Sequence, residues 1–459
     1  MESSRTILIK SAGPAVFLIL AFLLVFNFAD QSLLSPLVNP LLADFFGQTS
    51  DVVPLGWLTF AFTIISALST IAAGLLADRV SRLRLCFAGS MTYGLVAVLT
   101  VLVPHGRAGF AAFFLARALA GLGLGLIVPS VFALTGDLVP AGRRSTSFGY
   151  LSVAMLAGRM VGFAAGGALA ANWRLSYALI GGINLALSAV LVLLREPLRG
   201  AQEPELREAI LEGAAYRFHW SRKEIRAVWA APSNAWLILN FLDVIPGSII
   251  LFLIFKYMKD VHNMDAAAVN VAVFFVFLAG AGGAVIFGRL GDLWFRRDRR
   301  ARVWTALVCN AAPILFMVLF LSSRARIPEG SGIAETFAAP GVIGLVLAIA
   351  AAMFVNQGVN PNWYGALTDV NLPEHRAAMI SFASVMDMAG NALGPLCGAY
   401  LATVRGPRTA MAGVLVFWVL NIFLWLPVLV HVRRDLDRVH TILSERAARM
   451  KADLSAEMK

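Results

Sequence analysis

Twelve long apolar stretches constrain the fold of this chain more than any other feature. A membrane-spanning helix needs about 20 predominantly apolar residues. Stretches of that kind, separated by short polar or Gly/Pro-marked breaks, lie near 12–36, 53–77, 84–104, 108–136, 145–171, 175–195, 233–257, 266–288, 303–323, 339–363, 377–403 and 409–431. The 59% hydrophobic and 14% charged content excludes an ordinary soluble protein. The stretches do not alternate as barrel strands do, so we predict an all-α polytopic membrane protein with twelve transmembrane helices.

The basic residues fall mainly on one side of the predicted spans. If the N-terminus is cytoplasmic, 28 of the 38 Lys and Arg lie in cytoplasmic segments and 8 in outer loops. This positive-inside bias predicts that both termini are cytoplasmic. It also accounts for the net charge of +11 without a nucleic-acid partner, and we expect none. The high Ala and Arg content favours a multi-pass protein of a bacterial inner (plasma) membrane.

The two halves of the chain repeat a set of polar residues in register with their spans. The matches are Asn27 and Asp30 with Asn240 and Asp243; Gly74, Asp78 and Arg82 with Gly288, Asp292 and Arg296; and Asp137 and Arg144 with Asp369 and Arg376. The glycine rows 158, 162, 166 and 390, 394, 398 also correspond. Because an even number of spans separates the copies, the repeats have the same orientation, about an axis along the membrane normal.

The repeat predicts four regions. They are an N-terminal six-helix half (1–195), a cytoplasmic linker (196–232), a C-terminal six-helix half (233–431) and a basic cytoplasmic tail (432–459). Within the linker, residues 205–211 and 223–226 are typical of short amphipathic helices lying on the cytoplasmic face. A merely solvated linker is the alternative interpretation.

Three motifs carry a family resemblance. Residues 74–84 (GLLADRVSRLR) resemble the signature of the loop between helices 2 and 3 of the major facilitator superfamily, and residues 288–297 resemble its copy in the second half. Residues 117–125 (RALAGLGLG) are similar to the helix 4 pattern of that family. The first motif departs from the signature at Ser81 and Leu83, where the family usually has Gly and a basic residue.

The resemblance implies a cytoplasmic gate that holds the two halves together. Glycine permits close helix approach, and an aspartate can meet the N-terminus of a neighbouring helix. The candidate gate residues are Gly74, Asp78, Arg79, Arg82, Asp137, Arg144, Gly288, Asp292, Arg296, Asp369 and Arg376. Alternatively, these residues serve only as topology and folding signals.

A second, narrower resemblance concerns the substrate. Asp30, Arg117 and the stretch 362–369 (NWYGALTD) resemble spinster-like lysolipid and sphingolipid transporters. The chain departs from that group at Gln31 and Leu124, where its members usually have a basic and an acidic residue. The resemblance implies an amphipathic anion as substrate.

Ionisable side chains inside the spans are the candidates for substrate binding or proton coupling, because a charge at bilayer depth usually faces a cavity or a partner. With neighbouring amides, the set is Asp30, Gln31, Arg117, Arg159, Asn240, Asp243, Asn356, Asn360, Asp387 and Asn391. Asp30 and Arg117 are expected to pair. The pair either changes the open face when Asp30 is protonated or is a permanent structural ion pair. Arg159 either anchors an anionic substrate group or bonds to helix carbonyls.

We predict a secondary active transporter that works by alternating access and is proton-coupled, moving a small amphipathic or anionic solute such as a lysolipid. A proton-driven drug or metabolite exporter, a uniporter for sugars or organic acids, and a membrane receptor remain alternatives. An ATP-driven pump is disfavoured because the chain lacks a Gly-x4-Gly-Lys-Ser/Thr loop. An enzyme is disfavoured because the six histidines show no metal-ligand spacing. We therefore expect no catalytic residue, metal or cofactor, and a monomer whose partners are the small-molecule or lipid substrate, protons and membrane lipids.

Overall fold

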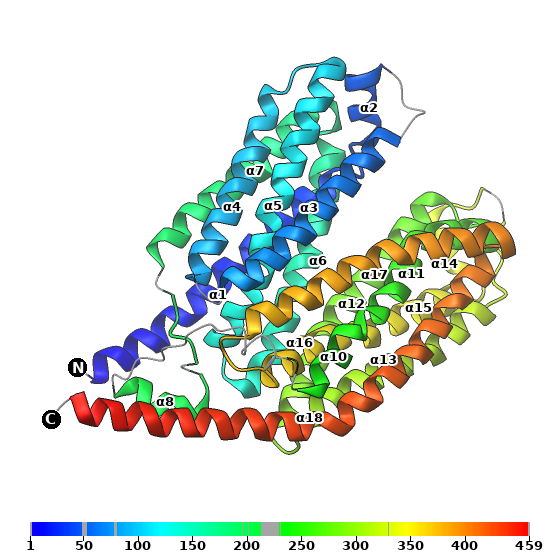
Figure 1. Ribbon diagram of the computed structural model, residues 1–459. Helices are drawn as coiled ribbons and strands as arrows, with labels where there is room; N and C mark the ends of the chain where they lie inside the picture. The colour runs from blue at the N-terminus through cyan, green and yellow to red at the C-terminus, as the bar shows by residue number, and fades with distance from the viewer. Residues whose placement is uncertain are drawn as a thin grey trace.

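The structure, a computed structural model, describes residues 2–47, 53–77, 80–194, 196–200, 202–212, 229, 231–328 and 330–457. All the regular structure in these residues is helical (Figure 1). The all-α prediction is therefore confirmed. Side chains of Asn240 and some other residues inside helices are not described.

The long helices form two bundles. The first bundle contains α1 (Glu2–Leu33), α3 (Val53–Ala77), α4 (Arg82–Leu99), α5 (Gly106–Leu138), α6 (Arg144–Ala168) and α7 (Trp173–Leu193). The second contains α10 (Pro232–Leu239), α11 (Val244–His262), α12 (Ala266–Phe295), α13 (Ala301–Ser322), α15 (Val342–Asn356), α16 (Val359–Asp369), α17 (Arg376–Arg405) and α18 (Pro407–Glu457). Short 3-10 turns are η1 (Thr100–Leu102), η2 (Ala141–Arg143), η3 (Ala170–Asn172) and η4 (Asn240–Asp243).

Eleven helical segments of the described residues are long and apolar enough to cross a membrane. They correspond to eleven of the twelve predicted spans. The twelfth, α17, is not among the eleven, although it has 30 residues. Asp387 and Asn391 lower the apolar character of α17. With α17, the layout is that of two sets of six spans.

Two predicted spans are interrupted rather than continuous. The span predicted at 233–257 contains the 3-10 turn η4 between α10 and α11, and the span predicted at 339–363 is divided between α15 and α16. Pro246 and Pro361 lie in the first turns of α11 and α16. The N–H groups of a first turn have no partner within the helix, so a proline at these positions costs no helical hydrogen bond and is compatible with a helix that begins there.

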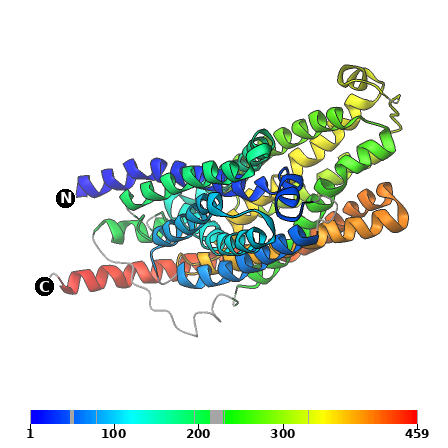
Figure 2. The same cartoon turned by 90° about the horizontal axis from the view of Figure 1, so that it is seen from above.

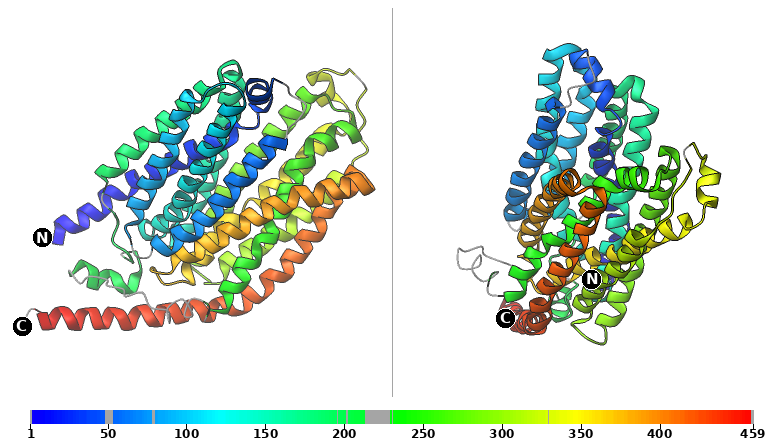
Figure 3. Two further views of the ribbon diagram at one scale, coloured as in Figure 1. Left: turned by 45° about the horizontal axis from the view of Figure 1, so that its top comes forward. Right: turned by 90° about the vertical axis from the view of Figure 1, so that its right-hand side faces the viewer.

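Both chain ends lie at the same end of the molecule, which we call the terminal side (Figure 1). The short helices α2 (Val38–Phe46) and α14 (Ile333–Ala338) lie at the opposite end, the far side. Figures 2 and 3 show the two bundles side by side, with α18 running on beyond the second bundle. A further short helix, α8 (Pro204–Leu211), packs on that extension and coincides with the first predicted linker helix. The second, at 223–226, lies outside the described residues.

The repeated glycine rows pack helices within each bundle. On α6, a Cβ at Gly162 would lie 2.1 Å from the Ala29 carbonyl oxygen of α1. On α17, a Cβ at Gly394 would lie 2.9 Å from the Ile245 carbonyl oxygen of α11. Both rows therefore bring the first and fifth spans of their bundle into backbone contact.

Candidate functional site

The two bundles contact each other closely at the terminal side. A Cβ at Gly74 of α3 would lie 2.3 Å from the Ser381 Oγ of α17. In the matching place, a Cβ at Gly288 of α12 would lie 2.7 Å from the Ser145 carbonyl oxygen of α6. The sequence-predicted gate glycines Gly74 and Gly288 are thus among the residues at which helices of opposite bundles approach.

Asp292 binds the N-terminus of a helix in the other bundle. Its carboxylate accepts hydrogen bonds from the backbone N–H groups of Ser145 (3.1 Å) and Thr146 (2.7 Å) and from the Thr146 hydroxyl (2.6 Å). These groups belong to the first turn of α6, where N–H groups have no partner in the helix and the dipole favours a negative charge. Asp78, its counterpart in the repeat, and Arg79 lie outside the described residues.

Two ion pairs cross between the bundles in a reciprocal arrangement. Arg144 Nη1 of the first bundle lies 2.7 Å from Asp369 Oδ1 of the second, and Arg376 Nη1 of the second lies 3.4 Å from Asp137 Oδ1 of the first. Asp369 and Arg376 each follow their counterparts by 232 positions, the offset expected from the repeat. All four side chains are buried. The repeat therefore places equivalent charges around one axis between the bundles.

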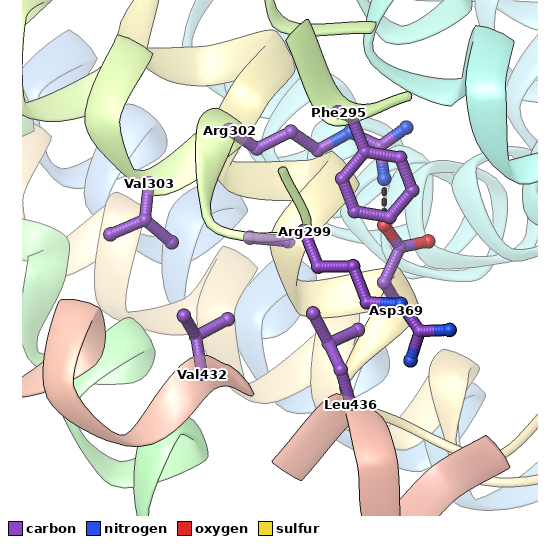
Figure 4. A pocket seen from close by; sticks show the side chains of 8 residues that line it. Phe295, Arg299, Arg302, Val303, Asp369, Val432 and Leu436 are labelled. Carbon is purple, nitrogen blue, oxygen red and sulfur yellow. Dashed lines mark ion pairs between the residues drawn. The ribbon is translucent and has the colours of Figure 1, made fainter. Parts of the chain in front are cut away.

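A second pair of arginines completes the arrangement. Arg82 pairs with Asp137 and donates to the Pro373 carbonyl oxygen at 2.7 Å. Arg302 likewise pairs with Asp369 and donates to the carbonyl oxygen of Ala141. Figure 4 shows Arg302 and Asp369 joined in this way, and the Arg302 guanidinium lies 4.0 Å from the centre of the Phe295 ring.

Arg302, and not Arg296, is the structural counterpart of Arg82. Arg296 is exposed and lies beside Gly142, outside these ion pairs. The prediction that matched Arg296 with Arg82 used the spacing between equivalent residues of α3 and α12. Equivalent residues of the next helices, α4 and α13, are six positions further apart. Ser90 and Asn310, which both lie at buried positions of that next helix, show the same larger offset and are the signal that could have identified Arg302.

Glu203, which the sequence analysis missed, joins the same group of charges. Its Oε1 accepts a hydrogen bond from Arg376 Nη2 at 2.6 Å and another from Arg144 Nη2. We call the eight charged residues the terminal-side cluster. Its members are Arg82, Asp137, Arg144, Glu203, Asp292, Arg302, Asp369 and Arg376. Four positive and four negative side chains balance one another there.

Aromatic rings lie next to the cluster and also join the bundles. Phe132 of α5 and Tyr364 of α16 have ring centroids 4.2 Å apart, and Phe148 of α6 contacts both rings. All three side chains are buried. The terminal side is thus closed by an apolar layer as well as by ion pairs.

Asp30 and Arg117 form a buried ion pair within the first bundle, as predicted. Arg117 Nη1 lies 2.6 Å from Asp30 Oδ2, and the two side chains are only 4% and 1% exposed. The rings of Phe62 and Tyr177 lie 5.2 and 5.1 Å from the Arg117 guanidinium. The pair is therefore enclosed by ring faces, which attract a cation.

The corresponding carboxylate of the second bundle, Asp243, has a different environment. Its Oδ1 accepts a hydrogen bond from Asn356 Nδ2 at 3.3 Å. Asp387 on α17 lies within electrostatic range of Asp243. Among the described residues, no Lys, Arg or His forms an ion pair with either carboxylate. In the described part of the chain, these two acidic groups of the second bundle thus have no cation paired with them.

The remaining candidates are less constrained. Arg159 is half-buried over the Phe28 ring, at 5.7 Å, and forms no ion pair among the described residues. Asn391 accepts a hydrogen bond from Ser248 at 2.8 Å. Gln31 and Asn360 are half-buried. The part of the chain that is described holds no group of three or more His, Cys, Asp or Glu placed to bind a metal ion.

Comparison with known proteins identifies the family. The sequence model of the Major Facilitator Superfamily matches residues 20–328. The chain belongs to this superfamily. It is 22% identical to the uncharacterized MFS-type transporter YceJ of Bacillus subtilis over 371 residues (78% of this chain, 90% of YceJ). It is 25% identical to the quinolone resistance protein NorA of Staphylococcus aureus over 312 residues (65% of this chain, 72% of NorA).

Solved structures of the superfamily share the fold. The fucose:proton symporter FucP of E. coli has a TM-score of 0.66 at 14% identity, over 90% of this chain and 98% of FucP. A bacterial homologue of the iron transporter ferroportin, in an outward-facing state, also has a TM-score of 0.66 at 14% identity, over 89% of this chain and 97% of that one. The superfamily consists of membrane transporters, so this chain is an integral multi-pass transporter and not an enzyme.

The contact at Gly288 gives a prediction. Gly288→Ala should destabilise the protein by about 1–3 kcal/mol, because the new Cβ overlaps a backbone oxygen of the other bundle. Gly282→Ala on the same helix is the control. A Cβ there would lie 3.7 Å from its nearest neighbour, an ordinary contact, and alanine is more stable than glycine inside a helix, so this variant should not be destabilised. Thermal unfolding in detergent compares the two variants. Equal melting temperatures would contradict the close contact between the bundles.

Proposed function

We propose that this protein is a secondary active transporter that works by alternating access. The observation that carries the proposal is the terminal-side cluster, in which reciprocal ion pairs join two bundles at one end of the molecule. If these contacts break and form together, the protein has two states, each open at the opposite face of the membrane. In this proposal the halves 1–195 and 233–431 rock about the substrate, and 196–232 and 432–459 form the linker and tail.

The terminal side is proposed to be cytoplasmic, since the basic residues of the chain gather in the segments on that side. The closed terminal side then corresponds to an outward-facing state. The proposed location is the inner (plasma) membrane of a bacterium, where the protein acts as a monomer among lipids.

Proton coupling is proposed to involve Asp243 and Asp387. An ionised carboxylate inside a membrane is costly unless it is paired, and binding a proton removes that cost. Asp30, in contrast, already has Arg117 as a partner. We therefore assign Asp30 and Arg117 a structural role, the second of the two interpretations left open by the sequence.

The proposed substrate is a small amphipathic or anionic solute such as a lysolipid. Support comes from Arg159, a half-buried arginine without an ion-pair partner among the described residues. A guanidinium in that situation can bind a carboxylate or phosphate. A second candidate is a cationic drug, for which the two unneutralised carboxylates of the second bundle provide the specific support. The similarity to a quinolone resistance protein is consistent with this second candidate.

Flux into proteoliposomes tests the proposal. Uptake of lysolipids, cationic drugs, sugars and organic anions is measured with and without an imposed pH gradient. We expect one class to accumulate only when the gradient is present. Flux that ignores the gradient would show a uniporter, and specific binding without flux of any class would show a receptor.

A further inference from the structure

One carboxylate of the linker lies between the two bundles. Glu203 immediately precedes α8 and is only 5% exposed. It bonds to Arg144 at the start of α6 in the first bundle and to Arg376 at the start of α17 in the second. These two arginines are equivalent in the repeat, so Glu203 occupies a position close to the axis that relates the bundles.

Glu203 completes the charge balance of the terminal-side cluster. Four buried arginines there face three carboxylates of the bundles, Asp137, Asp292 and Asp369. The fourth negative charge comes from the linker. The repeat contains no second copy of this residue, because the linker occurs once in the chain. A single side chain therefore serves both bundles.

The C-terminal extension of α18 holds Glu203 in this position. Leu206 and Ile210 of α8 pack against Val439, Leu443 and Ala447 of α18. Glu205 of α8 also pairs with His440 of α18. Figure 1 shows α8 lying along the end of α18. The tail thus supports the helix that begins directly after Glu203.

The geometry changes when the terminal side opens. If the bundles separate, Arg144 and Arg376 move apart, and one carboxylate can no longer bond to both. Glu203 therefore favours the closed state over the open one, because its contacts differ between the two states. Replacing its charge removes this preference.

We propose that Glu203 is a positioning residue of the transport cycle, which stabilises the terminal-side-closed state by bridging Arg144 and Arg376 while α18 keeps it in place. The inference rests on the proposed alternating-access function. Burial alone would raise the pKa of Glu203, but the charges of Arg144 and Arg376, and their hydrogen bonds, lower it to about 2. The contribution of this charge is complete above the ordinary pKa of 4.5 and disappears only as the pH falls towards about 2. The effect should be constant across neutral pH.

Thiol labelling at the contact between the bundles tests the proposal. The reporter is Ser381→Cys, at the place where α17 meets Gly74, in a chain with Cys86, Cys309 and Cys397 replaced by serine. A membrane-impermeant maleimide is applied from the terminal side. Glu203→Gln should raise the labelling rate by about fivefold or more, the lower end of typical coupling effects. Glu203→Asp, which keeps the charge, should restore part of the protection. An unchanged rate in Glu203→Gln would overturn the proposal.

Two controls separate opening from unfolding and from a general effect of the linker. Glu208→Gln removes a charge from an exposed pair of the same helix and should leave the rate unchanged. A second reporter, Ser188→Cys, lies in the buried interior of the first bundle and should stay unreactive. Reaction at Ser188→Cys in the Glu203→Gln protein would mean loss of the fold and would also overturn the proposal.

Leu443→Ser tests the contribution of the tail, since it weakens the contact between α8 and α18 while leaving Glu203 intact. It should raise labelling at Ser381→Cys as well, and no change would overturn the part assigned to α18. Labelling needs no substrate. If no solute is transported but labelling responds, the proposed function fails alone; if flux is found and labelling does not respond, the inference about Glu203 fails alone.

Discussion

Asp243→Asn should abolish the stimulation of transport by a pH gradient. The substitution keeps the shape of the side chain and its position beside Asn356, but the amide cannot bind or release the coupling proton. Without a coupling proton, the initial uptake rates with and without the gradient should become equal. The measurement is initial uptake into proteoliposomes with and without the gradient.

Asp30→Asn is the matched control for this result. It changes the repeat-related carboxylate, which is already neutralised by Arg117. The folded fraction of the Asp30→Asn protein should therefore keep its gradient stimulation. If stimulation survives in Asp243→Asn and is lost in Asp30→Asn, the coupling site lies in the first bundle. If stimulation survives in both variants, Asp387→Asn tests the other carboxylate of the second bundle.

Arg117→Met should destabilise the protein strongly. Removal of one partner leaves the other charge buried and uncompensated, which typically costs about 3–5 kcal/mol. The Asp30 carboxylate is 1% exposed, and among the described residues Arg117 is the cation that pairs with it, so without Arg117 its charge would be uncompensated. Thermal unfolding in detergent measures the loss.

The double variant Asp30→Leu with Arg117→Met should recover most of this stability, since replacing a whole buried pair by apolar side chains is often neutral. A double variant as unstable as Arg117→Met would show that the packing of Arg117 on Phe62 and Tyr177, rather than its charge, dominates.

Residues that recur in both halves could be predicted from the sequence. Asp137, Arg144, Asp369 and Arg376 stand out because the repeat conserves their spacing, and a common axis then brings equivalent residues together. The apolar stretches predicted the spans for a similar reason, since each one must satisfy its backbone inside lipid.

Features that depend on one half alone could not be predicted in this way. Glu203 lies in a linker without a counterpart, and nothing in its local sequence indicates that it reaches both bundles. The difference between Asp30 and Asp243 has the same origin. The repeat predicts that the two aspartates are equivalent, whereas the partner from the fourth span, an arginine in one half and an asparagine in the other, decides their charge environment.

The last membrane span and the tail are one uninterrupted helix, α18, of 51 residues. The part after His431 is about 39 Å long at 1.5 Å per residue. A rigid rod of that length moves its tip by about 7 Å for each 10° that the second bundle rotates about the base of the rod. A fluorophore at the C-terminus, with a partner on the first bundle, would therefore report conformational change with amplified sensitivity. A bulky fusion at this end would in turn slow the motion, so tags for functional work belong elsewhere.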